Sequence, residues 1–131
     1  MLRALFGATP SDLGLLVIRL FFGSSLALAH GFAKFVDLGG FADKIANKVP
    51  LAGVLGPAAG LSEFVGGLLL ALGLFTRPAA FFVLVTMSVA GFYIHAADPF
   101  MKKELAFAYA SAALAILIAG PGSLSLDRRG G

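Results

Sequence analysis

The sequence predicts an all-α integral membrane protein: a four-helix bundle with an interfacial amphipathic segment between its first and second helices. Hydrophobic residues make up 59% of the 131 residues and charged residues only 13%. A soluble domain typically has about 45–50% apolar residues and about 25% charged residues. The mean hydropathy is +0.94. Four apolar segments also approach the roughly 20 residues that a membrane-crossing helix needs. Because so few charges are available to face water, we expect lipid to cover most of the chain.

The first apolar segment runs from about residue 13 to 33. Ser11 and Asp12 precede it as candidate N-caps. Ala27-Leu28-Ala29 resembles a signal-peptidase site, but the apolar run is longer than a usual signal-peptide core and contains Arg19. We therefore expect this segment to be retained as a helix.

Residues 34–50 form the longest connection, and in it apolar and charged side chains alternate. Such a pattern favours a short amphipathic helix that lies in the membrane interface. The alternative is a flexible polar loop.

The remaining predicted spans are about 51–75, 78–95 and 105–119. Thr76-Arg77-Pro78 makes a tight turn, Asp98-Pro99 begins the fourth unit, and Pro121-Gly122 ends the bundle. Residues 1–131 thus form one domain. Lysine and arginine counts do not separate the two membrane faces, but Arg77 lies in a minimal loop, so we expect both termini to be cytoplasmic.

Several classes of function are excluded or disfavoured. The chain has no cysteine, so thiol chemistry and Cys-ligated metals are excluded. Its net charge of +3 comes from scattered basic residues, which does not predict nucleic-acid binding. Histidines and glutamates occur without the spacing of a metal site, and no motif of a soluble enzyme is present.

Two ionisable residues fall inside predicted spans, where a charge costs about 2.5–3.5 kcal/mol. Arg19 lies about six residues into the first helix, and Glu63 lies near the middle of the second. A long arginine side chain can reach toward the membrane centre, so we predict a buried Arg19–Glu63 ion pair. The pair has either a functional role or only the role of joining the two helices.

Further polar residues are expected at one depth of the bundle. Arg19 and His30 share a helical face, His95 ends the third span, and Glu104 opens the fourth. We predict that His30, His95 and Glu104 converge above the Arg19–Glu63 pair. The alternative is that each caps its own helix or lies in the headgroup layer, where Lys34 and Lys102 are expected to extend.

Short motifs along nearly the whole chain resemble the DoxX family. They are Arg19, His30-Gly31-x-x-Lys34, Glu63-x-x-Gly66-Gly67, Gly73-Leu74-x-Thr76-Arg77 and Gly120-Pro121-Gly122-x-x-Ser125-Leu126-Asp127. The resemblance implies a small four-helix integral protein of bacterial inner membranes. It also implies that some relatives associate with quinone-linked oxidoreductases, or with membrane complexes that handle oxidative stress and sulfur compounds.

We therefore expect an inner-membrane subunit that supports a redox partner complex. It would bind a quinone or similar amphipathic ligand through Arg19, His30, Glu63, His95 and Glu104, which offer hydrogen bonds and a proton route. Catalysis by this chain alone is not expected, because no cofactor motif is visible. The alternative is a non-catalytic assembly or chaperone-like module whose buried charges are structural. The sequence leaves a homo-oligomer open.

Overall fold

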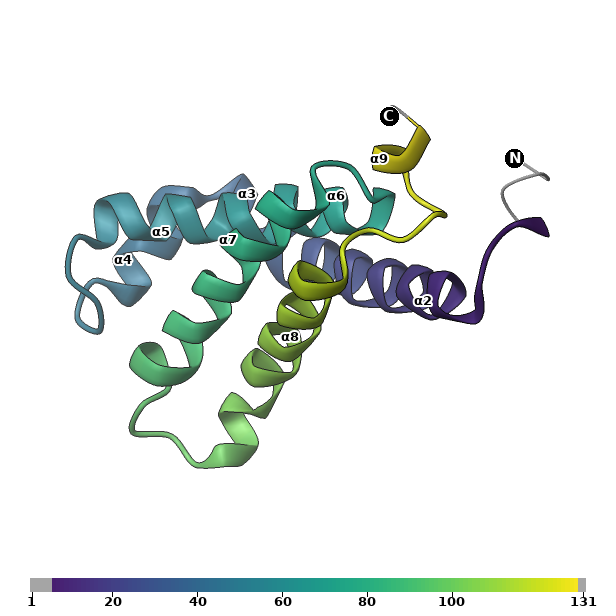
Figure 1. Cartoon of the computed structure of the whole chain (residues 1–131). Coiled ribbons are helices and arrows are strands. Elements are labelled where there is room, and N and C mark those ends of the chain that lie inside the picture. The colour runs from purple at the N-terminus through teal and green to yellow at the C-terminus, as the bar shows by residue number, and fades with distance from the viewer. Residues whose placement is uncertain (1–5, 130–131) are drawn as a thin grey trace.

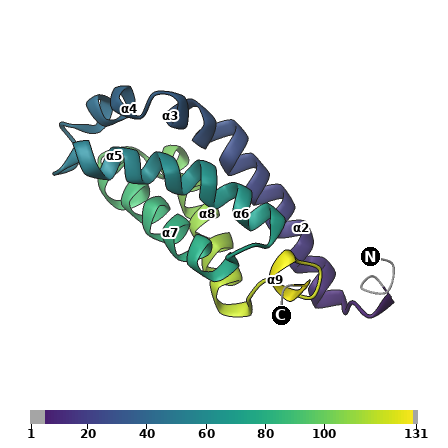
Figure 2. The ribbon, with the colours of Figure 1, turned by 90° about the horizontal axis from the view of Figure 1, so that it is seen from above.

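The computed structural model describes residues 6–129, which are helical with short turns and contain no strand. Figures 1 and 2 show the arrangement. The elements are α2 (Pro10–Ser25), η1 (Leu26–Gly31), α3 (Phe32–Val36), α4 (Leu38–Ile45), α5 (Ala52–Leu61), η2 (Ser62–Gly66), α6 (Gly67–Leu72), α7 (Thr76–Val89), η3 (Ala90–Ile94), α8 (Phe100–Ala119) and α9 (Leu126–Arg129), where η marks a π-helical segment.

Three continuous helices are long and apolar enough to cross a membrane: Pro10–Val36, Ala52–Leu72 and Thr76–Ile94. They correspond to the first three predicted spans, because a long, nearly uncharged apolar run favours a helix that crosses the membrane. The fourth long helix, α8, has 20 residues, but Lys102, Lys103 and Glu104 occupy its beginning. Its apolar stretch is correspondingly shorter, so α8 as a span stays a prediction.

The predicted amphipathic connection is a helix, α4, that packs on α5. Asp37 caps it by accepting a hydrogen bond from the Gly40 amide at 3.0 Å. Ala42 and Ile45 are buried. A side chain at Gly56 would meet the backbone of Ala42, so glycine is what lets α4 and α5 approach closely. The alternative of a flexible loop was therefore wrong.

The first two long helices run antiparallel, with α2 along α6 and η1 along η2. A Cβ added to Gly67 would lie 2.7 Å from the Gly23 carbonyl oxygen. This near-contact of backbones is the small-residue packing typical of membrane helices. Figure 1 shows α7 and α8 as a second antiparallel pair. Buried side chains from all four long helices form the core between the pairs, among them Leu26, Leu70, Val83, Met87 and Ile116.

The C-terminal segment folds back onto the start of the bundle. The Ser123 amide donates to Asp12 Oδ1 at 2.9 Å, and the Asp127 carboxylate accepts from the amides of Phe75 and Thr76 at 2.8 and 2.9 Å. Asp127 therefore caps α7 from a distant part of the chain. Figure 2 shows α9 beside the beginning of α2, so both ends of the described chain lie at one end of the bundle.

Candidate functional site

Three of the five predicted site residues lie in or beside the π-helical segments. His30 belongs to η1 and Glu63 to η2. His95 follows η3, and its amide donates to the carbonyl of Ala90, five residues earlier, at 3.0 Å. Isolated π-turns inside α-helices are rare and occur often at functional sites. Their coincidence with the predicted residues in three successive helices marks this level of the bundle as the candidate site.

Glu63 forms an ion pair with Lys34, whose Nζ lies 2.5 Å from Glu63 Oε2. The glutamate side chain is 4% exposed and the lysine side chain 27%. The Lys34 ammonium also lies 4.8 Å from the centre of the Phe41 ring, a cation–π distance. The pair therefore joins the first long helix to the buried middle of the second.

Two cavities meet at this ion pair. The first, of about 380 Å³, has mostly apolar walls from α4, α5, α7 and η3, including Ile45, Leu55, Phe82 and Val89. The second, of about 270 Å³, lies between η1, η2, η3 and α8 and is lined by Leu26, His30, Met87, Lys102 and Tyr109. Both cavities share Lys34, Glu63, Ala90 and His95. A strongly apolar chamber thus borders a more polar one across a few ionisable side chains.

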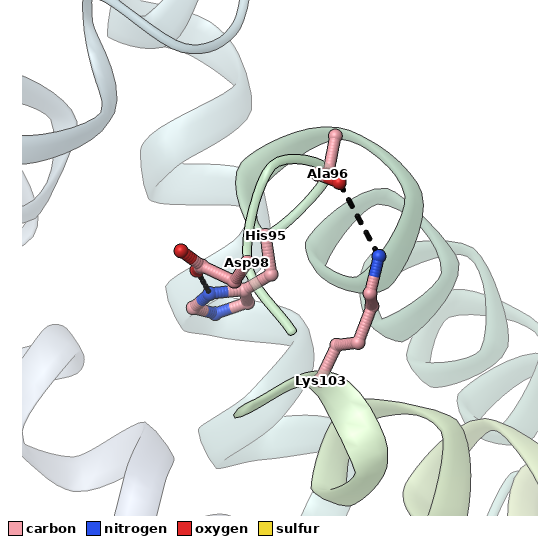
Figure 3. Close-up of polar contacts among 4 residues, drawn as sticks. All are labelled: His95, Ala96, Asp98 and Lys103. Carbon is pink, nitrogen blue, oxygen red and sulfur yellow. Dashed lines mark hydrogen bonds and ion pairs between the residues drawn. The ribbon is translucent and has the colours of Figure 1, made fainter. Parts of the chain in front are cut away.

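His95 is held by a carboxylate. Its Nδ1 lies 2.8 Å from Asp98 Oδ2, as Figure 3 shows, while Lys103 turns away and donates to the Ala96 carbonyl. The hydrogen bond from His95, helped by the positive charges of Lys102 and Lys48, lowers the pKa of Asp98 below its usual value. Asp98 is therefore an ionised acceptor at neutral pH.

His30, Glu63 and His95 all line the second cavity, so the structure brings these three predicted residues together. The His30 ring is half-buried and packs edge-on against the Tyr109 ring, with ring centres 5.6 Å apart.

The predicted Arg19–Glu63 ion pair is wrong. Arg19 is buried, but its guanidinium donates to three backbone carbonyls, those of Leu70 (3.1 Å), Pro121 (2.5 Å) and Leu124 (3.0 Å). Antiparallel packing places Arg19 beside the end of α6, where helix carbonyls lack partners. Glu63 instead lies opposite the end of the first helix, within reach of Lys34.

Glu104 is also not part of the cluster. It is exposed on the first turns of α8 and lines neither cavity, so it does not converge with His30 and His95 as predicted. Lys34 is the residue that the sequence reasoning missed, because it was expected to extend to the headgroups. Its place four residues after His30, on the same helical face, was the available indication.

The motif residues at the opposite end of the bundle form a structural clamp, defined here as Arg19, Gly73, Ser125 and Asp127. Gly73 has φ +70°, and a Cβ there would meet Ser125 and the Arg19 guanidinium. Burial would raise the pKa of Asp127, but hydrogen bonds from Thr76 and Phe75 outweigh it and lower that pKa. The clamp holds the C-terminal segment against α6 and α7.

Comparisons with known proteins agree with this layout. The profile of the DoxX family matches residues 14–96. An uncharacterized protein of Haemophilus influenzae is 34% identical over 113 residues, which cover 78% of this chain and 80% of that protein. No solved structure matches significantly.

Proposed function

Because the chain belongs to the DoxX family of membrane proteins, we propose that it is a four-span protein of the bacterial inner membrane that binds a quinone or a similar amphipathic ligand. The ligand occupies the two joined cavities, and the protein supports a redox partner complex. The observation that carries the proposal is the shared polar boundary between a large apolar cavity and a smaller, more polar one.

The position of the chain ends supports the fourth span. Ser123, which follows α8, is hydrogen-bonded to Asp12 at the start of α2. Three crossings would leave these residues on opposite sides of the membrane, whereas four return the chain to the side where it started. The charged first turn of α8 then lies at the opposite headgroup layer, and we propose that both termini are cytoplasmic.

The chemistry of the two cavities suits an amphipathic molecule. Apolar walls of the first cavity accept a ring or alkyl chain, while Lys34, His30 and His95 provide nitrogen atoms for hydrogen bonds to a polar headgroup. The Glu63 side chain is only 4% exposed, and hydrogen bonds to a group in such a low-dielectric environment are stronger than in water.

Electrons have to come from another protein in this proposal. The chain has no cysteine, and within residues 6–129 no group of three or more His, Asp or Glu side chains is placed to hold a metal. A membrane or peripheral redox protein is therefore the proposed partner. Exposed aromatic and aliphatic side chains on the outer faces of the long helices contact lipid.

Binding is testable with a short-chain alkyl benzoquinone added to detergent-solubilised protein. We expect saturable binding by isothermal calorimetry that Glu63→Gln weakens about tenfold, since it breaks the ion pair that orders the boundary. Glu104→Gln is the matched control and should bind as the wild type does. Equal affinity of all three proteins, or no saturable binding to the wild type, would contradict the proposal.

Arg19 favours a second candidate function, a non-catalytic assembly or chaperone-like module. Its three hydrogen bonds all go to backbone carbonyls, so this buried charge supports the fold alone. If Glu63→Gln abolishes folding or partner assembly and the wild type does not bind quinone, the assembly role is favoured.

A further inference from the structure

The His95–Asp98 pair fixes which nitrogen of the imidazole carries the proton. An ionised carboxylate can only accept hydrogen bonds, so His95 Nδ1 must donate to Asp98 Oδ2 across their 2.8 Å separation. In neutral imidazole the other nitrogen, Nε2, is then an acceptor. Within the described residues, Nε2 has no hydrogen-bond partner, and the His95 side chain is 38% exposed where it lines both cavities.

Glu63 is a second acceptor at the shared boundary. Its carboxylate only accepts hydrogen bonds, and the Lys34 ammonium donates one of its three N–H groups to it. The other charged or titratable groups around His95 lie on separate elements: His30 on η1, Lys102 and Tyr109 on α8, and Asp98 in the loop. A ligand headgroup at the boundary therefore meets His95 Nε2 and Glu63 as acceptors, and it also meets donors, which are the remaining N–H groups of Lys34 and the hydroxyl of Tyr109.

From this arrangement we infer that the cavities bind the reduced, hydroxyl-bearing form of a quinone-type ligand in preference to the oxidised form. A hydroquinone hydroxyl can accept from the donors at the boundary and also donate to His95 Nε2, whereas a quinone carbonyl can only accept and makes no hydrogen bond with that nitrogen. The inference rests on the proposed function and specifies its ligand. It concerns binding and includes no electron-transfer step.

The preference has a thermodynamic consequence for a partner enzyme. One neutral hydrogen bond corresponds to an affinity ratio of up to about tenfold. Tighter binding of the reduced form raises the reduction potential of the bound couple, by about 30 mV for a tenfold ratio in a two-electron couple. A quinone held here is thus a better electron acceptor than one in the free pool.

The test compares a short-chain alkyl benzoquinone with its hydroquinone under anaerobic conditions at about pH 8, because alkaline pH favours the neutral form of an imidazole. We expect the wild type to bind the hydroquinone several-fold to about tenfold more tightly. His95→Ala should remove the difference. Asp98→Asn should reduce it, because an amide can donate or accept and no longer fixes the tautomer. Asp43→Asn, at an exposed position on α4 that lines neither cavity, is the matched control.

Nitrogen NMR of histidine-labelled protein reads the tautomer directly, and the chain has only two histidines. With His30→Ala used to assign the signals, His95 should show a protonated Nδ1 and an unprotonated Nε2 in the wild type, and a mixture in Asp98→Asn. Equal affinity for both ligand forms, or a protonated Nε2 in the wild type, would overturn the inference. Saturable binding without a preference leaves the proposed function standing, whereas no binding of either form removes both.

Discussion

The clamp around Arg19 permits a quantitative prediction for Arg19→Met. The arginine side chain is 1% exposed and donates to three backbone carbonyls. Hydrogen bonds that involve a charged group contribute about 1.5–3 kcal/mol each, so three of them set an upper bound of about 4.5–9 kcal/mol. Removing the charge also removes a desolvation cost of several kcal/mol. Because the backbone carbonyls stay in place, with that of Leu70 in a buried contact and those of Pro121 and Leu124 in part-buried ones, we expect a net loss of about 3 kcal/mol.

Reversible unfolding in mixed micelles, followed by the loss of helical circular dichroism, measures this free energy. Arg77→Met is the matched control, since Arg77 is exposed and donates one bond of 3.2 Å to the Leu117 carbonyl. The loss in unfolding free energy for Arg77→Met should stay below about 1 kcal/mol. If Arg19→Met is no more destabilising than Arg77→Met, the clamp does not stabilise the fold as argued.

Three further predictions concern other contacts. Lys34→Met and Glu63→Met should each destabilise the protein by about 2 kcal/mol. The double variant should lose less than the sum of the two, with a coupling of at least about 0.5 kcal/mol in a double-mutant cycle. Additive losses would show that the pair does not form. Gly67→Ala should destabilise the protein in the same unfolding assay, because the added Cβ meets the opposing backbone. Gly53 has open space around it, so Gly53→Ala should be neutral or slightly stabilising. Equal effects of the two substitutions would contradict the close approach of the helices. Asp127→Asn should lower the stability at neutral pH. Because the native pKa of Asp127 is lowered, the stability difference between this variant and the wild type should shrink as the pH falls from about 4 through that native pKa. A pH-independent stability difference would contradict the capping role.

The helices were predictable because apolar composition and turn residues determine them locally. The ion pairs were not, because a pair depends on the axial register of two packed helices. That register is set by the Gly23–Gly67 contact, which places Lys34 opposite Glu63. Nothing in the spacing of one helix specifies the offset to its neighbour.

Two other structural features could not be predicted from the local sequence. Asp127 caps α7 across more than 50 positions of sequence, so its motif was visible as a resemblance but its physical role was not. The π-helical turns that carry His30 and Glu63 also have no simple sequence pattern. By contrast, the placement of His30 and His95 at one level followed from helix lengths and connections alone, whereas the sequence predicts Glu63 deeper in the bundle than the cavity that it lines with them.

We propose that an amphipathic quinone-type ligand occupies the two adjoining cavities. Photoaffinity labelling of the detergent-solubilised protein with an azido-benzoquinone, followed by peptide mapping, tests it most directly. We predict labelling of cavity residues such as Val89, Ala90 and Ile94, reduced by excess unlabelled quinone and by Glu63→Gln. Labelling spread over outer-face residues such as Phe21 and Ile118, which are exposed to lipid, and unaffected by the competitor would contradict it.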